Sequence, residues 1–275
     1  MKTPRATHYR ITALDPHAHL FEVRCTIAEP DRDGQRFRLP TWIPGSYLIR
    51  EFARHFVTVR AESGNAAIPI EKEAKDLWHA ASCAGPLTVI AEVYAFDLSV
   101  RAAYLDAARR FFNGPSVFLC PERRAEPPCV VEIFAPAGPA YRRWRVATTL
   151  PRADAAPCGF GSYRAARYDE LIGHSVEMAD FSQASFEGGG ATHDIAVSGH
   201  IHADLDRVAR DLSSANAATC RRRVSPRSPT NTAASSVLRA SHEYFHGWNV
   251  KRSKPAAFAP YDLGRENYTR QLWAF

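Results

Sequence analysis

Residues 19–27 read HLFEVRCTI, in which the apolar side chains of Phe21, Val23, Cys25 and Ile27 alternate with polar ones. This alternation is typical of a β-strand with one buried face and one face in water. Similar short runs, broken by Pro, Gly and Asp, extend from about residue 9 to residue 168. We therefore expect an all-β N-terminal region, and a sandwich of two packed sheets is its simplest architecture.

Other segments have strand, turn or helix patterns of their own. The predicted strands cover residues 56–61, 87–93, 129–134, 144–149 and 196–201, and the predicted turns cover residues 31–34 and 63–65. The triple glycine at 188–190 is also interpreted as a turn. Asp204 is a good N-cap, and the apolar residues that follow it at helical spacing predict a helix over residues 205–213.

Length and composition indicate an ordinary globular protein. The 275 residues correspond to roughly two domains, and the 45% hydrophobic content excludes disordered, collagen-like and coiled-coil classes. No run of 18 apolar residues and no signal peptide is visible, so we expect a cytoplasmic protein with no membrane contact. The six widely spaced cysteines are expected to be reduced thiols.

The net charge of +6 is modest for this length and does not by itself imply a nucleic-acid partner. The most basic segment is RRRVSPRSPTNTAASS, residues 221–236, which has almost no large apolar side chain. Such a composition is typical of a solvated linker. Nucleic-acid contact is the weaker alternative because no aromatic side chains are interleaved with the arginines. We expect no nucleic-acid partner.

The segment that carries chemistry is VLRASHEYFHGWNV, residues 237–250. On a helix, His242 and His246 lie on one face, one turn apart, and Glu243 follows the first histidine. In this H-E-x-x-H pattern two neutral imidazoles bind Zn²⁺, and the glutamate takes a proton from the water that the metal activates. The alternative is a partly buried helix whose histidines only form hydrogen bonds.

A catalytic zinc site of this kind needs a third protein ligand and an open position for water. The acidic residues downstream are Asp262 and Glu266. Spacing permits Glu266 as a ligand, but near the start of a short helical pattern it is better explained as a charge favoured by the helix dipole. The two histidines and Glu243 are therefore the predicted site residues.

Residues 242–275 resemble the zinc-site segment of the glycyl aminopeptidase family, bacterial metallopeptidases that usually carry a C-terminal PDZ domain. The segment LPTWIPGSYLIREFARHF, residues 39–56, resembles the N-terminal signature of that family, and YDELIGHSVEMADF, residues 168–181, resembles another of its segments. The resemblance implies an N-terminal β-sandwich, residues 1–170, followed by a partial thermolysin-like catalytic domain, residues 171–275. It also implies zinc ligands at His242 and His246 and a catalytic base at Glu243.

Two departures from the family pattern concern the metal site. The family's third ligand is a glutamate in a W-x-x-E-G segment, whereas this sequence has Trp273, Ala274 and Phe275 and then stops. The family's G-G-L-E-H motif has no counterpart here, and the tract at 221–236 stands in its place. We therefore expect a truncated catalytic domain that lacks an internal segment, and we attribute the difference to a deletion or a shifted reading frame in the gene.

Other candidate residues have competing interpretations. Trp42, Tyr47 and Trp78 are expected to be core aromatics rather than a cleft lining. Arg50 and Arg54, four positions apart, are suited to clamping a carboxylate, and a surface helix or strand end explains them about as well. The histidine pairs 17/19 and 200/202 have strand spacing that can bind metal, but solvated or hydrogen-bonded histidines are the better explanation.

The combined prediction is zinc-dependent peptide hydrolysis of the aminopeptidase type, impaired in this chain, with a peptide as substrate. The main alternative is a non-catalytic β-sandwich that only binds or has a structural role. A third hypothesis is self-association, in which a partner chain supplies the missing ligand. The sequence does not fix the oligomeric state.

Overall fold

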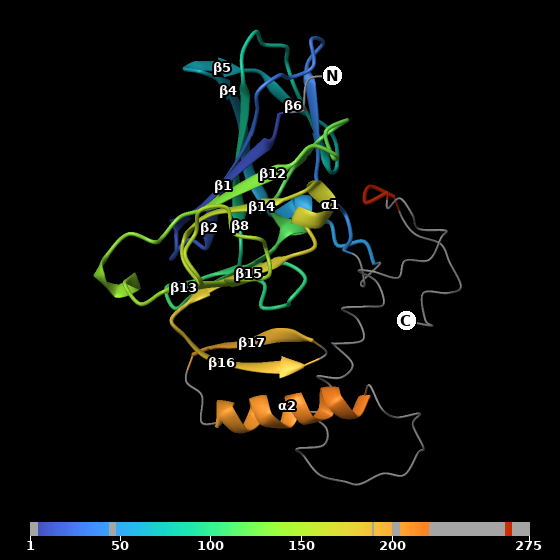
Figure 1. Ribbon diagram of the computed structural model, residues 1–275. Helices are drawn as coiled ribbons and strands as arrows, with labels where there is room; N and C mark the ends of the chain where they lie inside the picture. The colour runs from blue at the N-terminus through green and yellow to red at the C-terminus, as the bar shows by residue number, and fades with distance from the viewer. Residues whose placement is uncertain (1–4, 44–47, 189, 200–203, 220–261, 266–275) are drawn as a thin grey trace. The chain divides into compact units, whose positions relative to one another are not determined.

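The computed structural model describes residues 5–43, 48–188, 190–199, 204–219 and 262–265. These residues fall into two compact units. The first contains the described residues up to Asp180 together with 262–265, and the second begins at Phe181. The ribbon in Figure 1 shows the strands and helices of each unit.

A seven-stranded sheet forms the framework of the first unit, with strand order β14-β12-β1-β2-β8-β4-β5. Its strands are β1 (Thr7–Asp15), β2 (Leu20–Ile27), β4 (Phe56–Ser63), β5 (Ala66–Ile68), β8 (Leu87–Tyr94), β12 (Cys129–Ile133) and β14 (Gly161–Ala165). All neighbouring pairs are antiparallel except β1 and β12, which pair in parallel. Along β2 every second residue is buried, as the alternation in its sequence predicts.

Two four-stranded sheets complete this unit, with orders β13-β15-β10-β9 and β11-β3-β7-β6. The first contains β9 (Ala103–Leu105), β10 (Arg109–Asn113), β13 (Arg145–Thr148) and β15 (Ser175–Ala179). The second contains β3 (Gln35–Arg38), β6 (Ile70–Ala74), β7 (Leu77–Ala80) and β11 (Cys120–Pro121). Short helical turns connect these strands: η1 (Phe52–His55), η2 (Gly114–Ser116), η3 (Pro139–Tyr141) and α1 (Tyr168–Leu171).

One hydrophobic core joins the three sheets. Phe21 on β2 meets Phe112 on β10 edge to face, with ring centroids 6.1 Å apart. Phe56 on β4 lies 5.3 Å from the ring of Trp78 on β7. Aromatic pairs at these distances add to the free energy gained by burying apolar surface. The predicted N-terminal β-sandwich is thus confirmed.

The second unit contains a β-hairpin and a helix. Strands β16 (Phe181–Gly188) and β17 (Ala191–Ser198) pair antiparallel, and α2 (Leu205–Thr219) contributes Ala209 to a small core with Ala184 and Phe186. Gly190 has φ +80°, a backbone conformation that glycine adopts at little cost, which suits its place in the turn between the strands. No helix within the described residues has the length and apolar character needed to cross a membrane.

Most predicted elements are present with shifted ends. Residues 196–198 of the strand predicted over 196–201 form the last part of β17, residues 200–201 lie outside the described residues, and the helix predicted over 205–213 extends to Thr219. The end of α2 reads SSANAAT, whose small residues give no apolar periodicity but are compatible with a helix. The division into domains at 1–170 and 171–275 stays a prediction, since most of the second range lies outside the described residues.

Candidate functional site

The predicted zinc ligands His242 and His246 and the predicted base Glu243 lie outside the residues that the structure describes, as does Glu266. Within the described residues, no group of three His, Cys, Asp or Glu side chains is arranged to hold a metal ion. The assignment of these three site residues therefore rests on the sequence motif.

The segment 262–265, between the H-E-x-x-H motif and Glu266, is held by the N-terminal signature. The indole Nε1 of Trp42 donates to the carbonyl oxygen of Asp262 at 3.2 Å and to that of Arg265 at 2.9 Å. The backbone N–H and the hydroxyl of Thr41 both donate to the carbonyl oxygen of Leu263, at 2.8 and 2.9 Å. Four hydrogen bonds therefore fix the backbone of this short segment on the first unit.

The carboxylate of Asp262 binds two neighbours in its own turn. One oxygen accepts the backbone N–H of Gly264 at 3.1 Å, and the other forms an ion pair with Arg265 at 3.2 Å. An aspartate that accepts an N–H two residues further on is a common way to stabilise a turn. This local role favours a structural function for Asp262 over metal ligation.

The aromatic residues that the sequence places in the core are buried where the structure describes them. Trp42 is 0% exposed and Trp78 is 5% exposed, and Tyr47 lies outside the described residues. The interpretation of the two tryptophans as core residues is therefore confirmed. The buried indole of Trp42 is the one that binds the segment 262–265.

The histidine pair 17/19 belongs to a turn between β1 and β2. The backbone N–H of His17 donates to the carboxylate of Asp15 at 2.8 Å, and Nδ1 of His19 lies 2.6 Å from the carbonyl oxygen of Leu105. The side chain of His19 is therefore explained by a hydrogen bond, which is the alternative to metal binding. The pair 200/202 lies outside the described residues.

Arg50 and Arg54 line one cleft of about 220 Å³ in the first unit. Arg50 lies just before η1 and Arg54 lies within it, whereas Asp97, Ser99 and Arg101 come from the loop after β8. The remaining lining residues are Ile49, Phe52, His55 and Ala102. Two of the three arginines, Arg50 and Arg54, are residues that the sequence singled out, and a carboxylate clamp by them stays a prediction. The sequence carries no signal for Arg101 because the packing of two distant loops brings this residue to the cleft.

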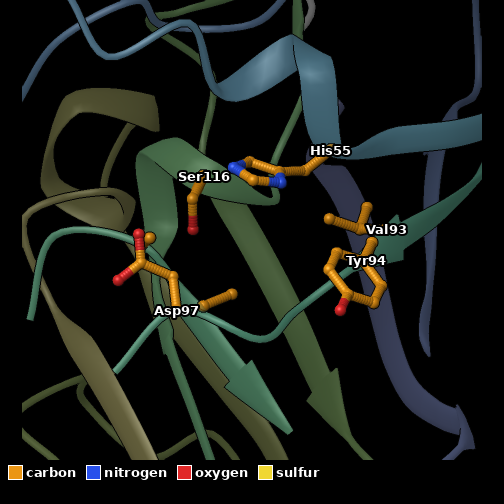
Figure 2. Close-up of a pocket in the computed structure, with 7 residues that line it drawn as sticks. His55, Val93, Tyr94, Asp97 and Ser116 are labelled. Carbon is orange, nitrogen blue, oxygen red and sulfur yellow. The ribbon is translucent and has the colours of Figure 1, made fainter. Parts of the chain in front are cut away.

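A smaller hollow adjoins the cleft and shares His55 and Asp97 with it. Its volume is about 10 Å³, which is room for about one water molecule. Figure 2 shows the side chains of His55, Asp97 and Ser116 around this hollow. The hydroxyl of Ser116 donates to the carbonyl oxygen of Asn113 at 2.7 Å, so its proton is committed to the backbone and not to the imidazole. This geometry does not support a serine hydrolase site.

Charges in the cleft shift the pKa values of its ionisable groups. Burial lowers the pKa of Arg50, and the charge of Arg101 lowers it further. Burial also lowers the pKa of His55, with a further contribution from the charge of Arg54. Burial alone would raise the pKa of Asp97, but hydrogen bonds from Ser99 and the positive charge of Arg54 hold it below its ordinary value.

The chain has recognisable relatives among protein families and solved structures, although no curated protein sequence matches it. Residues 8–180 match the family described as the Peptidase M61 N-terminal domain, and residues 235–275 match the M61 glycyl aminopeptidase family. A crystal structure of an aminopeptidase N family protein from Idiomarina loihiensis is 35% identical, with a TM-score of 0.88.

The alignment with the Idiomarina protein covers 97% of this chain and 52% of that one, so the chain spans about half the length of its relative. An M1 zinc metallopeptidase from Deinococcus radiodurans is 10% identical with a TM-score of 0.39, covering 78% of this chain and 52% of that chain. Because the N-terminal family match alone spans residues 8–180 of the 275, the chain belongs to the M61 glycyl aminopeptidase family.

Proposed function

We propose that the protein hydrolyses peptides from their N-terminus, with His242 and His246 as zinc ligands and Glu243 as general base. The observation that carries this proposal is the H-E-x-x-H motif inside residues 235–275, the part of the chain that matches the M61 glycyl aminopeptidase family. The comparisons support membership of this peptidase family. Zinc binding, the role of each residue and activity in this chain are what we propose.

The donor set suits zinc in its chemistry. Imidazole nitrogens are among the usual zinc ligands, and two of them one helical turn apart need little reorganisation to meet one ion. Zinc, when bound, supplies a Lewis acid that lowers the pKa of a water ligand to about 7. Glu243 would then accept a proton at its carboxylate, and the histidines would hold the ion in place. The family's third ligand, a glutamate, has no counterpart within residues 1–275.

The second candidate function is that of a binding module, in which the β-sandwich acts without catalysis. The observation that favours it is the arginine-lined cleft, which lies wholly within the first unit. Cytoplasmic location, lack of membrane contact and lack of a nucleic-acid partner remain predictions for either function.

Zinc stoichiometry of the chelator-dialysed chain tests the proposal, with a His246→Ala variant as the control. One zinc per chain, lost in the variant, together with release of glycine from glycyl peptides, would support the peptidase function. The same stoichiometry in both proteins would show that the motif is not the metal site. No zinc binding and no hydrolysis would leave the binding module as the function of this chain.

A further inference from the structure

The cleft at η1 holds an excess of positive charge. Its lining contains three arginines, Arg50, Arg54 and Arg101, and one carboxylate, Asp97. His55 does not add to this charge: its Nε2 accepts a hydrogen bond from Nε of Arg54 at 3.2 Å, so that nitrogen is unprotonated and the ring is neutral. The guanidinium charges therefore exceed the carboxylate charge by two.

Two of these arginines have no acidic partner within the described part of the chain. Among the residues that the structure describes, neither Arg54 nor Arg101 forms an ion pair, whereas Arg109 pairs with Glu177 at 2.9 Å. Arg101 lies close enough to Arg50 for its charge to act on it: burial is the main cause of the lowered pKa of Arg50, the charge of Arg101 lowers it further, and Asp97 opposes both. Like charges held close together are unfavourable unless an anion is drawn to them. An anion in the cleft would relieve this repulsion.

The size and lining of the cleft restrict the anion that it can take. Its volume of about 220 Å³ is below the roughly 300 Å³ at which pockets for drug-sized ligands begin, so a ligand of about amino-acid size fits best. Ile49, Phe52 and Ala102 add apolar surface beside the arginines. Asp97 reduces the attraction for a multiply charged anion such as a phosphate. Guanidinium groups present paired donors that match the two oxygens of a carboxylate.

We infer that this cleft binds the carboxylate group of a small organic acid of about amino-acid size, with Arg101 as the charged donor. Two kinds of molecule carry such a group: a short peptide, through its C-terminus, and a free small acid. The peptide source rests on the proposed function, whereas binding of the carboxylate itself does not depend on zinc or on hydrolysis.

Isothermal titration of the full 275-residue chain in the presence of a chelator tests the inference, because hydrolysis is then absent. The probes are glycylglycine, its C-terminal amide and acetate. Glycylglycine is expected to bind with a Kd of about 1 mM, and the amide about tenfold more weakly because it lacks the charged acceptor. Acetate binding as tightly as glycylglycine would assign the site to free acids, and weaker acetate binding would assign it to peptide ends.

Two variants change the charge of the cleft in opposite directions. Arg101→Gln should weaken glycylglycine binding about tenfold by removing one charged donor. Asp97→Asn should strengthen it about threefold, because it removes the negative charge while an amide oxygen can still accept the N–H of Ser99. Arg32→Gln makes the same charge change on an exposed turn outside the cleft and should leave the affinity unchanged.

The inference is overturned if none of the three probes shows binding at a probe concentration of roughly 20 mM, which is about 20-fold above the expected Kd. It is also overturned if the amide binds as tightly as the acid, or if Arg101→Gln and Arg32→Gln weaken binding equally. Circular dichroism of each variant shows that it is folded. A chain without zinc or hydrolysis that still binds glycylglycine would refute the proposed function and leave this inference intact.

Discussion

The indole nitrogen of Trp42 donates a hydrogen bond to the carbonyl oxygen of Asp262, 220 positions further along the chain. Trp42 lies in the N-terminal signature at 39–56, and Asp262 lies in the segment at 242–275 that resembles the zinc-site region of the family. Two separate stretches that carry the family resemblance therefore meet in space. This contact gives the signature a physical role, which is to bind the chain that follows the H-E-x-x-H motif.

Trp42→Phe keeps an aromatic ring in the core but removes the donor to Asp262 and Arg265. We expect the free energy of unfolding to fall by about 1–3 kcal/mol, because two carbonyl groups lose a hydrogen bond and a buried ring becomes smaller. Amide hydrogen exchange at Gly264 and Arg265 should become faster. Denaturant titration and exchange mass spectrometry measure the two effects.

Trp78→Phe is the matched control for this variant, since Trp78 is also buried and packs against Phe56. It should lower the free energy of unfolding as well, but it should leave exchange at 262–265 unchanged under native conditions. Equal exchange in the two variants would contradict a specific role of Trp42 in holding this segment.

Glu243→Gln tests the proposed catalytic base. The substitution removes the proton acceptor and retains both histidines, so zinc stoichiometry should be unchanged while peptide hydrolysis falls at least about a hundredfold. Metal analysis and glycine release from glycyl peptides are the two measurements. Turnover equal to that of the unmodified chain would rule out this role for Glu243.

Asp106 predicts an acid-dependent loss of stability. Its carboxylate accepts hydrogen bonds from the hydroxyl of Tyr104 at 2.8 Å and from the backbone N–H groups of Ala108 and Arg109, both at 2.7 Å. Burial alone would raise the pKa of Asp106, but these bonds hold it below its ordinary value. The folded state therefore favours the ionised form.

The stabilisation from Asp106 is fully present above the unfolded pKa of about 3.9 and is lost as the pH falls through the lower folded pKa. Asp106→Asn should lower the free energy of unfolding by about 1 kcal/mol at pH 7, since the site is partly solvent-exposed. The difference between the two proteins should shrink below about pH 4. Urea titrations at pH 7 and pH 3 that give the same difference would contradict this assignment.

The cysteines should differ widely in their reaction with iodoacetamide. Cys129 is 0% exposed, and burial raises its pKa to about 12, so little thiolate forms and the reagent cannot reach it. Cys83 is partly exposed and is expected to react at least about a hundredfold faster at pH 8. Peptide mapping by mass spectrometry gives both rates, and urea should abolish the difference. Similar rates in the native protein would show that the sheet around Cys129 opens readily.

The sequence predicts the strands whose side chains alternate, and it misses those held mainly by backbone pairing. The alternation over 19–27 predicts β2, which buries every second residue. Ile70–Ala74, with the sequence IEKEA, forms the edge strand β6 although most of it is exposed. An edge strand needs a neighbour to bond with and no apolar face, so its own residues carry little signal. The parallel pairing of β1 with β12 likewise depends on distant segments.

The same distinction between local and distant contributions applies to the candidate sites. Helical spacing alone predicts that His242 and His246 share one face, so a local motif was enough to predict a metal site, which stays a prediction. Arg50 and Arg54 were recognised because they are four positions apart. The sequence carries no signal for Arg101 or Asp97, because only the folded chain brings the loop after β8 to the same cleft.

The parallel pairing of β1 with β12 also sets the order in which the protein can assemble during synthesis. Arg10 and Glu132 face each other across this pair and are separated by 122 positions. A ribosome adds residues at about 5–20 per second, so β1 leaves the exit tunnel roughly 6–25 seconds before its partner. During that time one edge of β1 offers unpaired backbone groups to other strands. We expect the nascent chain to be most vulnerable to misassembly in this interval.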